Sequence, residues 1–272
     1  MPKYVHLAGK IAGLPHGPEL TERLTALHEP QAAYIAAGRN VVAGYTRGWG
    51  LEFGGLAESV RNDPIYRESI DLARDRTILP EHKLMNLFII MKYGIGRRGG
   101  DIMEFGAYRG GSAIFLANIA RRLEMRGRVY AFDTFEGMPE THAMDMHSAG
   151  DFGDTNLDDL KARVRDIGLT NLEFVKGLFE NTAEAIVSRS PAIALAHIDC
   201  DIYEAVKYCL KVCQAKMHPS GGYLVMDDAL QGSCLGALEA TEDWVVGTNV
   251  RAEQAYPHLV YRYPPVAAAP LP

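Results

Sequence analysis

From Asp101 onward the chain alternates short apolar runs with segments of helical periodicity, and this alternation limits the possible folds more than any other feature. The runs are DIMEFG, RVYAFD, LEFVKG, AIALAHID and GGYLVMDD. Strands that alternate with helices form parallel sheets covered on both faces. We therefore expect an α/β fold with a doubly wound, Rossmann-like arrangement around a mostly parallel sheet.

The two ends of the chain depart from this alternation. NVRAEQAY and HLVYRY are extended runs separated by one proline, which predicts an antiparallel hairpin at one edge of the sheet. PELTERLTALHEPQAAYIAAG, ESVRNDPIYRESIDLARD and PEHKLMNLFIIMKYGIG have helical spacing, whereas RNVVAGYTRGWGLEFGGL is glycine-rich and indicates a loop or a short arm. We expect a helical, lid-like extension over 1–79, a main domain over 80–264 and a frayed tail over 265–272.

Composition excludes several classes of partner. The 272 residues are 47% apolar and 23% charged, enough for one large domain with small additions. A net charge of -6 argues against a nucleic-acid partner, because such proteins usually carry a basic excess. No stretch approaches the roughly 20 apolar residues of a membrane span, and the start MPKYVHLAGK has no apolar signal core. We expect a cytoplasmic protein without a membrane partner.

Four cysteines, Cys200, Cys209, Cys213 and Cys234, are consistent with a compartment that keeps thiols reduced. Cys209 and Cys213 share a helix face, so a metal site with Cys200 is one interpretation. We favour the other one, small buried thiols on an amphipathic helix, because it explains the same spacing.

The stretch EFGAYRGGS links the first strand of the alternating part to a helix. Its glycines, Gly106, Gly110 and Gly111, allow a tight turn and let a ligand approach bare backbone at the start of a helix. The pattern is GxxxGG and not the dinucleotide fingerprint GxGxxG. Glu104 lies just before it and would repel a phosphate. These residues favour a cationic ligand such as the ammonium or sulfonium of S-adenosylmethionine.

Asp133 ends the second strand, in FDTF. An acidic residue there can accept both ribose hydroxyls of a nucleoside, whether the ligand is NAD or S-adenosylmethionine. A turn or helix-capping aspartate is the alternative.

Two further acidic stretches, HIDCDIYE and VMDD, end two predicted central strands. Carboxylates that meet at one edge of a sheet repel one another unless a cation or a proton offsets their charge. Asp199, Asp227 and Asp228 would offer oxygen ligands only, which suit Mg²⁺ better than Mn²⁺ or Ca²⁺. Alternatively Asp201 caps the helix that begins near Tyr203, and Asp228 caps the helix after its own loop. Capping explains single residues but not their shared position.

The histidines are less informative. His197 lies either near the site or in the core, and we favour a hydrogen-bonded core histidine. His142 and His147 belong to the long stretch MPETHAMDMHSAGDFGDTN, which has few apolar anchors. Such a stretch beside a strand-end pocket is typical of a lid or a substrate contact, with an ordinary solvated loop as the alternative.

Together these stretches resemble the macrocin O-methyltransferase family of mycinamicin- and novobiocin-type sugar O-methyltransferases. The resemblance covers roughly Pro80 to Val246 and rests on EFGAYRGGSA, AFDTFEGMP, EFVKGLFENT, HIDCDIYEA and SGGYLVMDD in that order. It implies a class I S-adenosylmethionine-dependent methyltransferase that acts on sugar hydroxyls with the help of Mg²⁺. The first ninety residues match less clearly.

The resemblance also implies roles for residues. Glu104 and Gly106 would hold the methionine part of S-adenosylmethionine, Asp133 the ribose, and Gly177 with Phe179 the adenine side. The further cofactor contacts implied are Tyr108, Gly110, Ser112, Phe135 and Asp199. The metal ligands implied are Asp199, Asp227 and Asp228. Related enzymes that act on catechols place a lysine shortly after the corresponding aspartate, and the stretch DIYE offers none here.

The expected reaction follows from the acceptor. A sugar hydroxyl has a high pKa, so methyl transfer needs a base or a Lewis acid. We expect Mg²⁺ to bind adjacent hydroxyls of a small-molecule or saccharide acceptor, such as a glycosylated natural product, and Asp199 or Asp201 to take the proton. The sequence does not choose between these two aspartates. Met- and Tyr-containing helices in the amino-terminal part suggest a homo-oligomer.

Three rival functions remain. A glycosyltransferase would use the DxD of Asp199 to Asp201 to hold a metal and a nucleotide diphosphate, but no basic residue stands beside it. A nicotinamide dehydrogenase would need the missing GxGxxG. A non-catalytic S-adenosylmethionine-binding protein would be favoured by damage to the acidic set, and all of its members are present.

Overall fold

The computed structural model describes residues 35–36, 39–40, 56–254 and 257–265. Backbone packing divides the chain into two units, Met1–Ser59 and Val60–Pro272, and each is described by itself. In the first unit β1 (Ile35–Ala36) pairs antiparallel with β2 (Arg39–Asn40), so the end of the first expected helix is a short strand. The rest of that helix, most of the glycine-rich arm and the tail from 266 lie outside the described residues.

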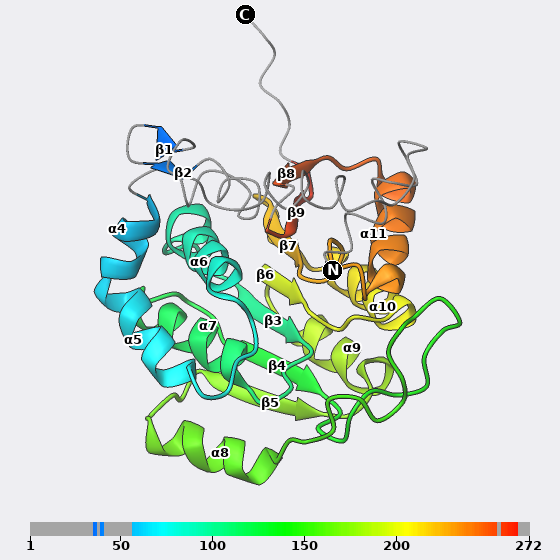
Figure 1. Ribbon diagram of the computed structural model, residues 1–272, viewed down its shortest axis with the longest axis horizontal. Coiled ribbons are helices and arrows are strands. Elements are labelled where there is room, and N and C mark those ends of the chain that lie inside the picture. The colour runs from blue at the N-terminus through cyan, green and yellow to red at the C-terminus, as the bar shows by residue number, and fades with distance from the viewer. Residues whose placement is uncertain (1–34, 37–38, 41–55, 255–256, 266–272) are drawn as a thin grey trace, which may run out of the picture. The chain divides into compact units, whose positions relative to one another are not determined.

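The second unit is built on a seven-stranded sheet of order β5-β4-β3-β6-β7-β9-β8 (Figure 1). Its strands are β3 (Asp101–Phe105), β4 (Val129–Asp133), β5 (Leu172–Lys176), β6 (Ile193–Ile198), β7 (Gly222–Met226), β8 (Ala252–Gln254) and β9 (Leu259–Tyr263). The five strands β3 to β7 are parallel, β9 is antiparallel to β7, and β8 is antiparallel to β9. The expected α/β class and the antiparallel edge hairpin are confirmed.

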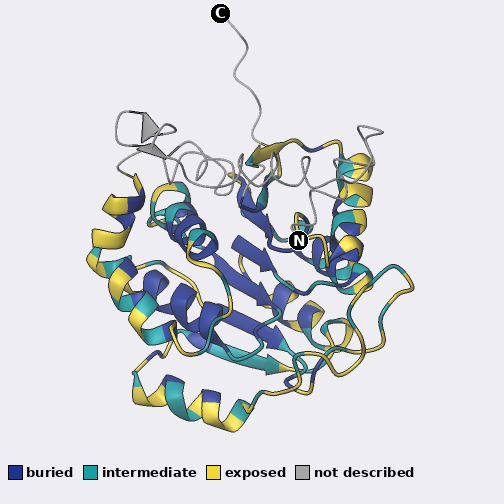
Figure 2. Ribbon diagram, in the orientation of Figure 1, coloured by how far each residue is buried: buried dark blue, intermediate teal, exposed yellow. Residues whose placement is uncertain are grey.

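Helices cover both faces of this sheet (Figure 1). The helical elements are α4 (Leu56–Asn62), α5 (Pro64–Ala73), α6 (Glu81–Ile89), the π-helix η2 (Ile90–Ile95), α7 (Gly111–Arg122), α8 (Leu157–Asp166), α9 (Phe179–Arg189), α10 (Tyr203–Gln214) and α11 (Leu235–Thr248). α5 and α6 pack on α7, whereas α9 and α11 pack on α10. The strands between these layers are largely buried (Figure 2), as expected for a parallel sheet with two covered faces.

The segment ESVRNDPIYRESIDLARD forms two helices where its periodicity suggested one. Pro64 has no backbone N–H and begins α5, and the Asp63 carboxylate caps that helix by accepting a hydrogen bond from the Ile65 N–H at 2.9 Å. α5 buries the Tyr66 ring, whose centroid lies 5.8 Å from that of Phe115 on α7. α5, which lies within the expected 1–79 extension, therefore contributes to the core of the second unit.

The order of the strands creates a switch point between β3 and β6. The chain passes from β3 to β4 and β5 on one side and returns to β6 on the other, so the carboxyl ends of β3 and β6 adjoin. Gly106 makes this contact: its φ is +93°, and a Cβ there would lie 1.6 Å from the Asp199 carbonyl oxygen. Only glycine fits. The stretches EFG and HID, far apart in sequence, meet here, where doubly wound folds bind ligands.

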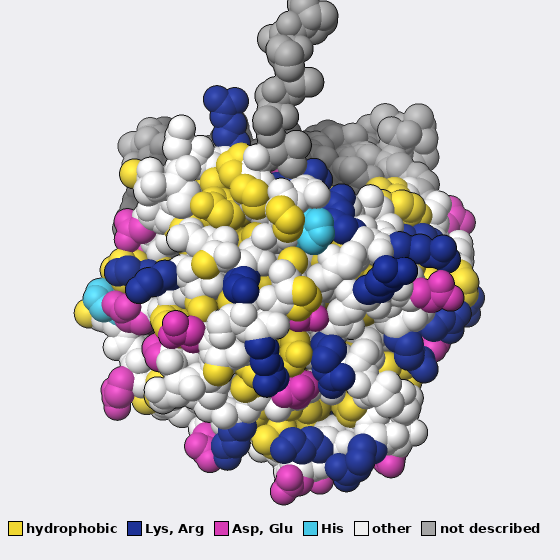
Figure 3. Space-filling model, turned by 180° about the vertical axis from the view of Figure 1, so that it is seen from behind, with side chains coloured by type: hydrophobic (Ala, Val, Ile, Leu, Met, Phe, Trp, Pro, Cys, Tyr) yellow, Lys and Arg dark blue, Asp and Glu magenta, His cyan; other side chains and the backbone are white. Residues whose placement is uncertain are grey.

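The surface shows no strong separation of charge on the face seen in Figure 3, where basic and acidic side chains are intermixed. Across the described residues, no helix combines the length and the apolar character needed to cross a bilayer.

Candidate active site

A pocket of about 900 Å³ opens at the carboxyl edge of the sheet. This volume is at the upper end of the roughly 300–1,000 Å³ typical of ligand pockets. The predicted residues that line it are Gly106, Tyr108, Ser112, Asp133, Phe179, Asp199, Asp201, Asp227 and Asp228. The predicted residues Glu104, Gly110, Phe135 and Gly177 are not part of the lining. Phe135 is buried and packs edge-on against Phe174.

The loop between α5 and α6 forms one wall of the pocket. Arg76, Thr77, Ile78 and Leu79 all line it. The loop rests directly on the GxxxGG turn, because a Cβ on Gly111 would lie 2.3 Å from the Thr77 backbone nitrogen. The third glycine of the motif is therefore required by the covering loop.

Asp133 lies at the end of β4 beside the same turn. Its carboxylate accepts hydrogen bonds from the backbone N–H groups of Tyr108 at 2.8 Å and Phe135 at 2.7 Å. Burial raises the pKa of this carboxyl above its usual value, although these hydrogen bonds act in the opposite direction. Asp133 therefore stabilises its own turn, and since a carboxylate has about four lone-pair positions it keeps acceptor capacity for a ligand in the pocket.

Three carboxylates meet at the ends of β6 and β7. Asp199, Asp227 and Asp228 each have a carboxylate oxygen within 4.8 Å of the other two. Burial, followed by repulsion from neighbouring carboxylates, raises the pKa of Asp199 and of Asp228 well above the usual range. A divalent cation would relieve this repulsion, and an oxygen-only donor set fits Mg²⁺.

The capping alternative for these acids is wrong. α10 begins after Ile202 without a side-chain cap, and α11 begins after Cys234 without one. Asp228 instead accepts hydrogen bonds from the Asp201 backbone N–H at 3.0 Å and from Gln231 Nε2 at 2.8 Å.

His197 lies between Glu104, at the end of β3, and Asp227, at the end of β7, and contacts both carboxylates. It is fully buried, with Nδ1 3.0 Å from Glu104 Oε2 and Nε2 3.2 Å from Asp227 Oδ1. Burial opposes the charged form, but the Glu104 and Asp227 carboxylates outweigh it and raise the pKa of His197 to about 10. Both ring nitrogens therefore carry protons at neutral pH. The prediction of a hydrogen-bonded core histidine is confirmed.

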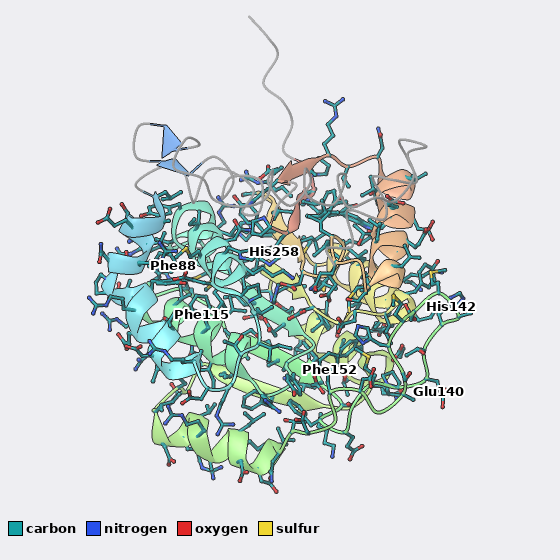
Figure 4. The ribbon with its side chains drawn as sticks, in the orientation of Figure 1. Phe88, Phe115, Glu140, His142, Phe152 and His258 are labelled. Carbon is teal, nitrogen blue, oxygen red and sulfur yellow. The ribbon has the colours of Figure 1, made fainter. Side chains whose placement is uncertain are left out.

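Two residues that the sequence did not single out complete this arrangement. Lys83, buried on α6, forms an ion pair with the Asp227 carboxylate and donates to its backbone carbonyl at 2.9 Å. His258 places Nε2 2.8 Å from Asp227 Oδ1, and Asn86 Nδ2 donates to its Nδ1 at 2.9 Å (Figure 4). Burial lowers the pKa of His258 to about 4, so the ring is neutral and donates from Nε2. In the sequence, Lys83 and Asn86 could have been noticed because they are polar residues within an apolar helical run.

We call Glu104, His197, Asp227, Lys83 and His258 the buried network. Its two cations, on Lys83 and His197, balance its two anions. Although burial disfavours the charged form of Asp227, hydrogen bonds from the two histidines hold its pKa well below the usual range. One acceptor is left over, since Glu104 Oε1 is buried without a hydrogen-bond partner.

The long loop after β4 contributes one histidine to the pocket. His147 lines it, whereas His142 is exposed and its ring lies 5.4 Å from that of Tyr203 (Figure 4). The loop is anchored by Asp145, whose Oδ1 accepts a hydrogen bond from the Tyr203 N–H at 3.0 Å. This loop therefore contributes to the pocket wall, and its role as a lid or substrate contact stays a prediction.

The cysteine interpretation is also resolved. Cys200, Cys209 and Cys213 are free and buried. The metal-competent groups of side chains in the described ranges do not include these three together. They are buried thiols in the core, as favoured.

A sheet of this order, with an acid at the end of β4 and acids that line a pocket at the switch point, is the arrangement of a class I methyltransferase fold. Solved structures agree. The O-methyltransferase NovP matches with a TM-score of 0.60 and 22% identity, over 76% of this chain and 94% of that one. The calicheamicin methyltransferase CalS11 matches with a TM-score of 0.58 and 20% identity, over 93% of this chain and 95% of that one. At these identities the likeness concerns the fold.

The sequence model of the macrocin-O-methyltransferase (TylF) family matches residues 83–252, and the chain belongs to this family of methyltransferases. An 8-demethyl-8-(2,3-dimethoxy-alpha-L-rhamnosyl)-tetracenomycin-C 4'-O-methyltransferase of Streptomyces olivaceus is 30% identical over 51% of this chain and 56% of its own length. The demethyldecarbamoylnovobiocin O-methyltransferase of Streptomyces niveus is 25% identical over 70% of this chain and 81% of its own length. The first of these matches thus spans only about half of the relative.

Proposed function

We propose that the protein transfers a methyl group from S-adenosylmethionine to a hydroxyl of a sugar, carried by a glycosylated natural product or a saccharide, with Mg²⁺ in the site. The observation that carries this proposal is the meeting of the GxxxGG turn, Asp133 and the acidic cluster in one pocket. The names of the relatives support the acceptor class, since one acts on a rhamnosyl tetracenomycin and another, from Micromonospora griseorubida, on mycinamicin III.

For the cofactor, S-adenosylmethionine would supply the methyl group on a sulfonium. Asp133 has acceptor capacity for the ribose hydroxyls, and Gly106 leaves backbone accessible in the pocket wall. Glu104 is not part of the pocket lining, but its buried Oε1 has no hydrogen-bond partner, and we propose that this oxygen accepts a hydrogen bond from the ammonium of the methionine part. Phe179 offers an apolar surface for the adenine.

For the metal, we propose Asp199, Asp227 and Asp228 as ligands. Mg²⁺, when bound, would lower the pKa of a hydroxyl that shares its coordination sphere. Asp227 is held in place by Lys83 and the two histidines, whereas Asp199 is only partly buried and faces the pocket. Asp199 is therefore the ligand that would meet the acceptor.

For the base, we propose Asp201 and leave Asp199 as metal ligand. Asp201 lines the pocket, and burial raises its pKa above the usual value, which makes its carboxylate a stronger base at neutral pH. It would take the proton of the acceptor hydroxyl as the oxygen attacks the methyl carbon. Its backbone φ of +57° is unusual for a non-glycine residue and is held by the hydrogen bond to Asp228.

Residues 76–79, at the end of the lid-like extension expected over 1–79, and His147, in the long loop after β4, border the same pocket, and we propose that both form part of a lid. We also propose a cytoplasmic location, because all four cysteines are free. Association through the amino-terminal part remains a prediction.

The test has two parts. Thermal unfolding with S-adenosylmethionine, S-adenosylhomocysteine, NAD and UDP-sugars should show stabilisation by the first two only, since a ligand that binds the folded state raises its stability. Stabilisation by a UDP-sugar would favour the glycosyltransferase. Mass spectrometry with a panel of glycosides should then show methyl transfer that EDTA abolishes and Mg²⁺ restores. Full activity in EDTA would refute the metal role.

A further inference from the structure

Three side chains of different chemistry meet on the pocket wall, beside the oxygen-only cluster. His147 comes from the loop after β4, Asp201 from the end of β6 and Cys234 from the residue before α11. Cys234 Sγ lies 3.3 Å from Asp201 Oδ1 and 3.7 Å from His147 Nε2, and the remaining separation, Nε2 to Oδ1, is 3.6 Å. The three atoms form a nearly equilateral triangle.

Hydrogen bonds to sulfur account for two sides of this triangle, from Cys234 Sγ to Asp201 Oδ1 and to His147 Nε2, but the third side is not a hydrogen bond. A separation of 3.6 Å between His147 Nε2 and Asp201 Oδ1 exceeds the usual 2.7–3.2 Å of an N–H···O hydrogen bond. Around tetrahedral Zn²⁺, with Zn–S near 2.3 Å and Zn–N and Zn–O near 2.0–2.2 Å, ligand atoms are about 3.4–3.6 Å apart. The three observed separations lie close to these edges.

The donor set also differs from that of Mg²⁺. An imidazole nitrogen, a sulfur and one carboxylate oxygen suit a borderline-soft ion, whereas Mg²⁺ prefers oxygen alone.

We propose that His147, Asp201 and Cys234 form a second metal site, for Zn²⁺ or a divalent ion of the same coordination chemistry, separate from the three-carboxylate site. Binding displaces the thiol proton of Cys234 to solvent. Since all three residues line the pocket, the fourth coordination position is open to it, for a water molecule or an acceptor oxygen.

Occupancy has two consequences. It joins the loop after β4 to the loops after β6 and β7, which fixes the wall of the pocket. It also engages the Asp201 carboxylate, so Zn²⁺ inhibits methyl transfer if Asp201 is the base. The site itself does not depend on that role.

Co²⁺ is the probe, because a thiolate ligand gives Co²⁺ a charge-transfer band in the near ultraviolet and tetrahedral geometry gives intense visible bands. Titration of the full chain, with Mg²⁺ in excess to fill the oxygen site, should give both bands at one Co²⁺ per chain, and Zn²⁺ should remove them. Cys234→Ser should lose the charge-transfer band. His147→Ala, on an exposed loop, should weaken Co²⁺ binding at least about tenfold, and His142→Ala on the same loop should leave it unchanged.

Absence of a charge-transfer band in the wild type, or its persistence in Cys234→Ser, would overturn the proposal. If Cys234→Ser fails to fold, unchanged affinity in His147→Ala overturns it equally. The readout involves neither S-adenosylmethionine nor turnover. Failure of this site is therefore distinguishable from failure of the proposed methyl transfer.

Discussion

Two neighbouring groups of acidic residues at the carboxyl edge of the sheet have opposite electrostatics. In the buried network, Glu104 and Asp227 are matched by His197 and Lys83, and the pKa of Asp227 is low. In the pocket, Asp199 and Asp228 repel each other and Asp227, and their pKa values are high. Asp227 and Asp228 are adjacent in sequence, so their surroundings and not their residue type set this difference.

The difference separates structure from function. A balanced buried network fixes the ends of β3, β6 and β7, whereas an unbalanced cluster that faces a pocket awaits a cation or a proton. Substitutions confined to the first should lower stability and those confined to the second should lower activity, whereas Asp227 belongs to both groups.

The largest expected effect is on the buried network. His197→Ala leaves the Glu104 and Asp227 carboxylates buried without their shared cation, and it should lower the free energy of unfolding by about 3–5 kcal/mol. Urea denaturation measures this. His218→Ala is the matched control, since His218 lies outside the network, and it should cost less than about 1 kcal/mol. Equal losses in the two variants would show that the network is not a stabilising unit.

The next effect is on turnover. Asp199→Asn removes one charge from the proposed metal site and should reduce kcat about 10²- to 10³-fold, with S-adenosylmethionine affinity changed only a few-fold. Asp166→Asn, an exposed aspartate at the end of α8, is the control. Initial rates and calorimetric binding of the cofactor provide the measurement. Normal turnover in Asp199→Asn would remove this residue from the site.

A pH effect of smaller size separates the two groups. The folded-state pKa values of Asp199 and Asp228 are raised, so their protonated forms stabilise the fold at acid pH and this contribution is lost as pH rises. Mg²⁺ should therefore raise the melting temperature by a few degrees more at about pH 8 than at about pH 5.

The pKa of His197 also makes stability depend on pH, but it is raised by attraction to carboxylates and not by repulsion between them. This contribution does not affect the comparison with and without Mg²⁺. The folded-state pKa of His197 is raised to about 10, so its contribution to stability is fully present below the unfolded-state pKa near 6.5. This contribution is lost as the pH rises through about 10, with or without Mg²⁺. The difference between Mg²⁺-loaded and Mg²⁺-free melting curves isolates the pocket carboxylates. An equal Mg²⁺ effect at both pH values would contradict their raised pKa.

The smallest predicted effect concerns Lys83. Its ammonium binds Asp227 and is a positive charge beside the proposed cation site, so Lys83→Met should tighten Mg²⁺ binding about threefold to tenfold. Lys92→Met is the matched control, because Lys92 pairs with Asp63 instead. Weaker Mg²⁺ binding in Lys83→Met would mean that Lys83 chiefly positions Asp227 as a ligand.

Local patterns predicted much of the fold. The five apolar runs became β3 to β7 because buried parallel strands need continuous apolar residues. The acids at the ends of β4, β6 and β7 mark the functional edge. The break at Pro64 was not predicted, although proline is tolerated only in the first turn of a helix and therefore marks the start of α5.

Other features came only from tertiary packing. Lys83 on α6, His197 on β6 and His258 just before β9 meet at one carboxylate, that of Asp227, and no local spacing indicates that meeting. The same holds for Asp145, which accepts a local hydrogen bond from the His142 N–H and a second one from the distant start of α10. The sequence shows where the acidic residues are, whereas the tertiary packing determines which of them are paired with a cation.

The most direct test of this account is calorimetric titration of Mg²⁺ into protein saturated with S-adenosylhomocysteine. We predict one Mg²⁺ per chain in the wild type and in Asp166→Asn, and none in Asp199→Asn at the same concentrations. No binding by the wild type, or unchanged binding by Asp199→Asn, would contradict the assignment of the pocket carboxylates to a catalytic cation.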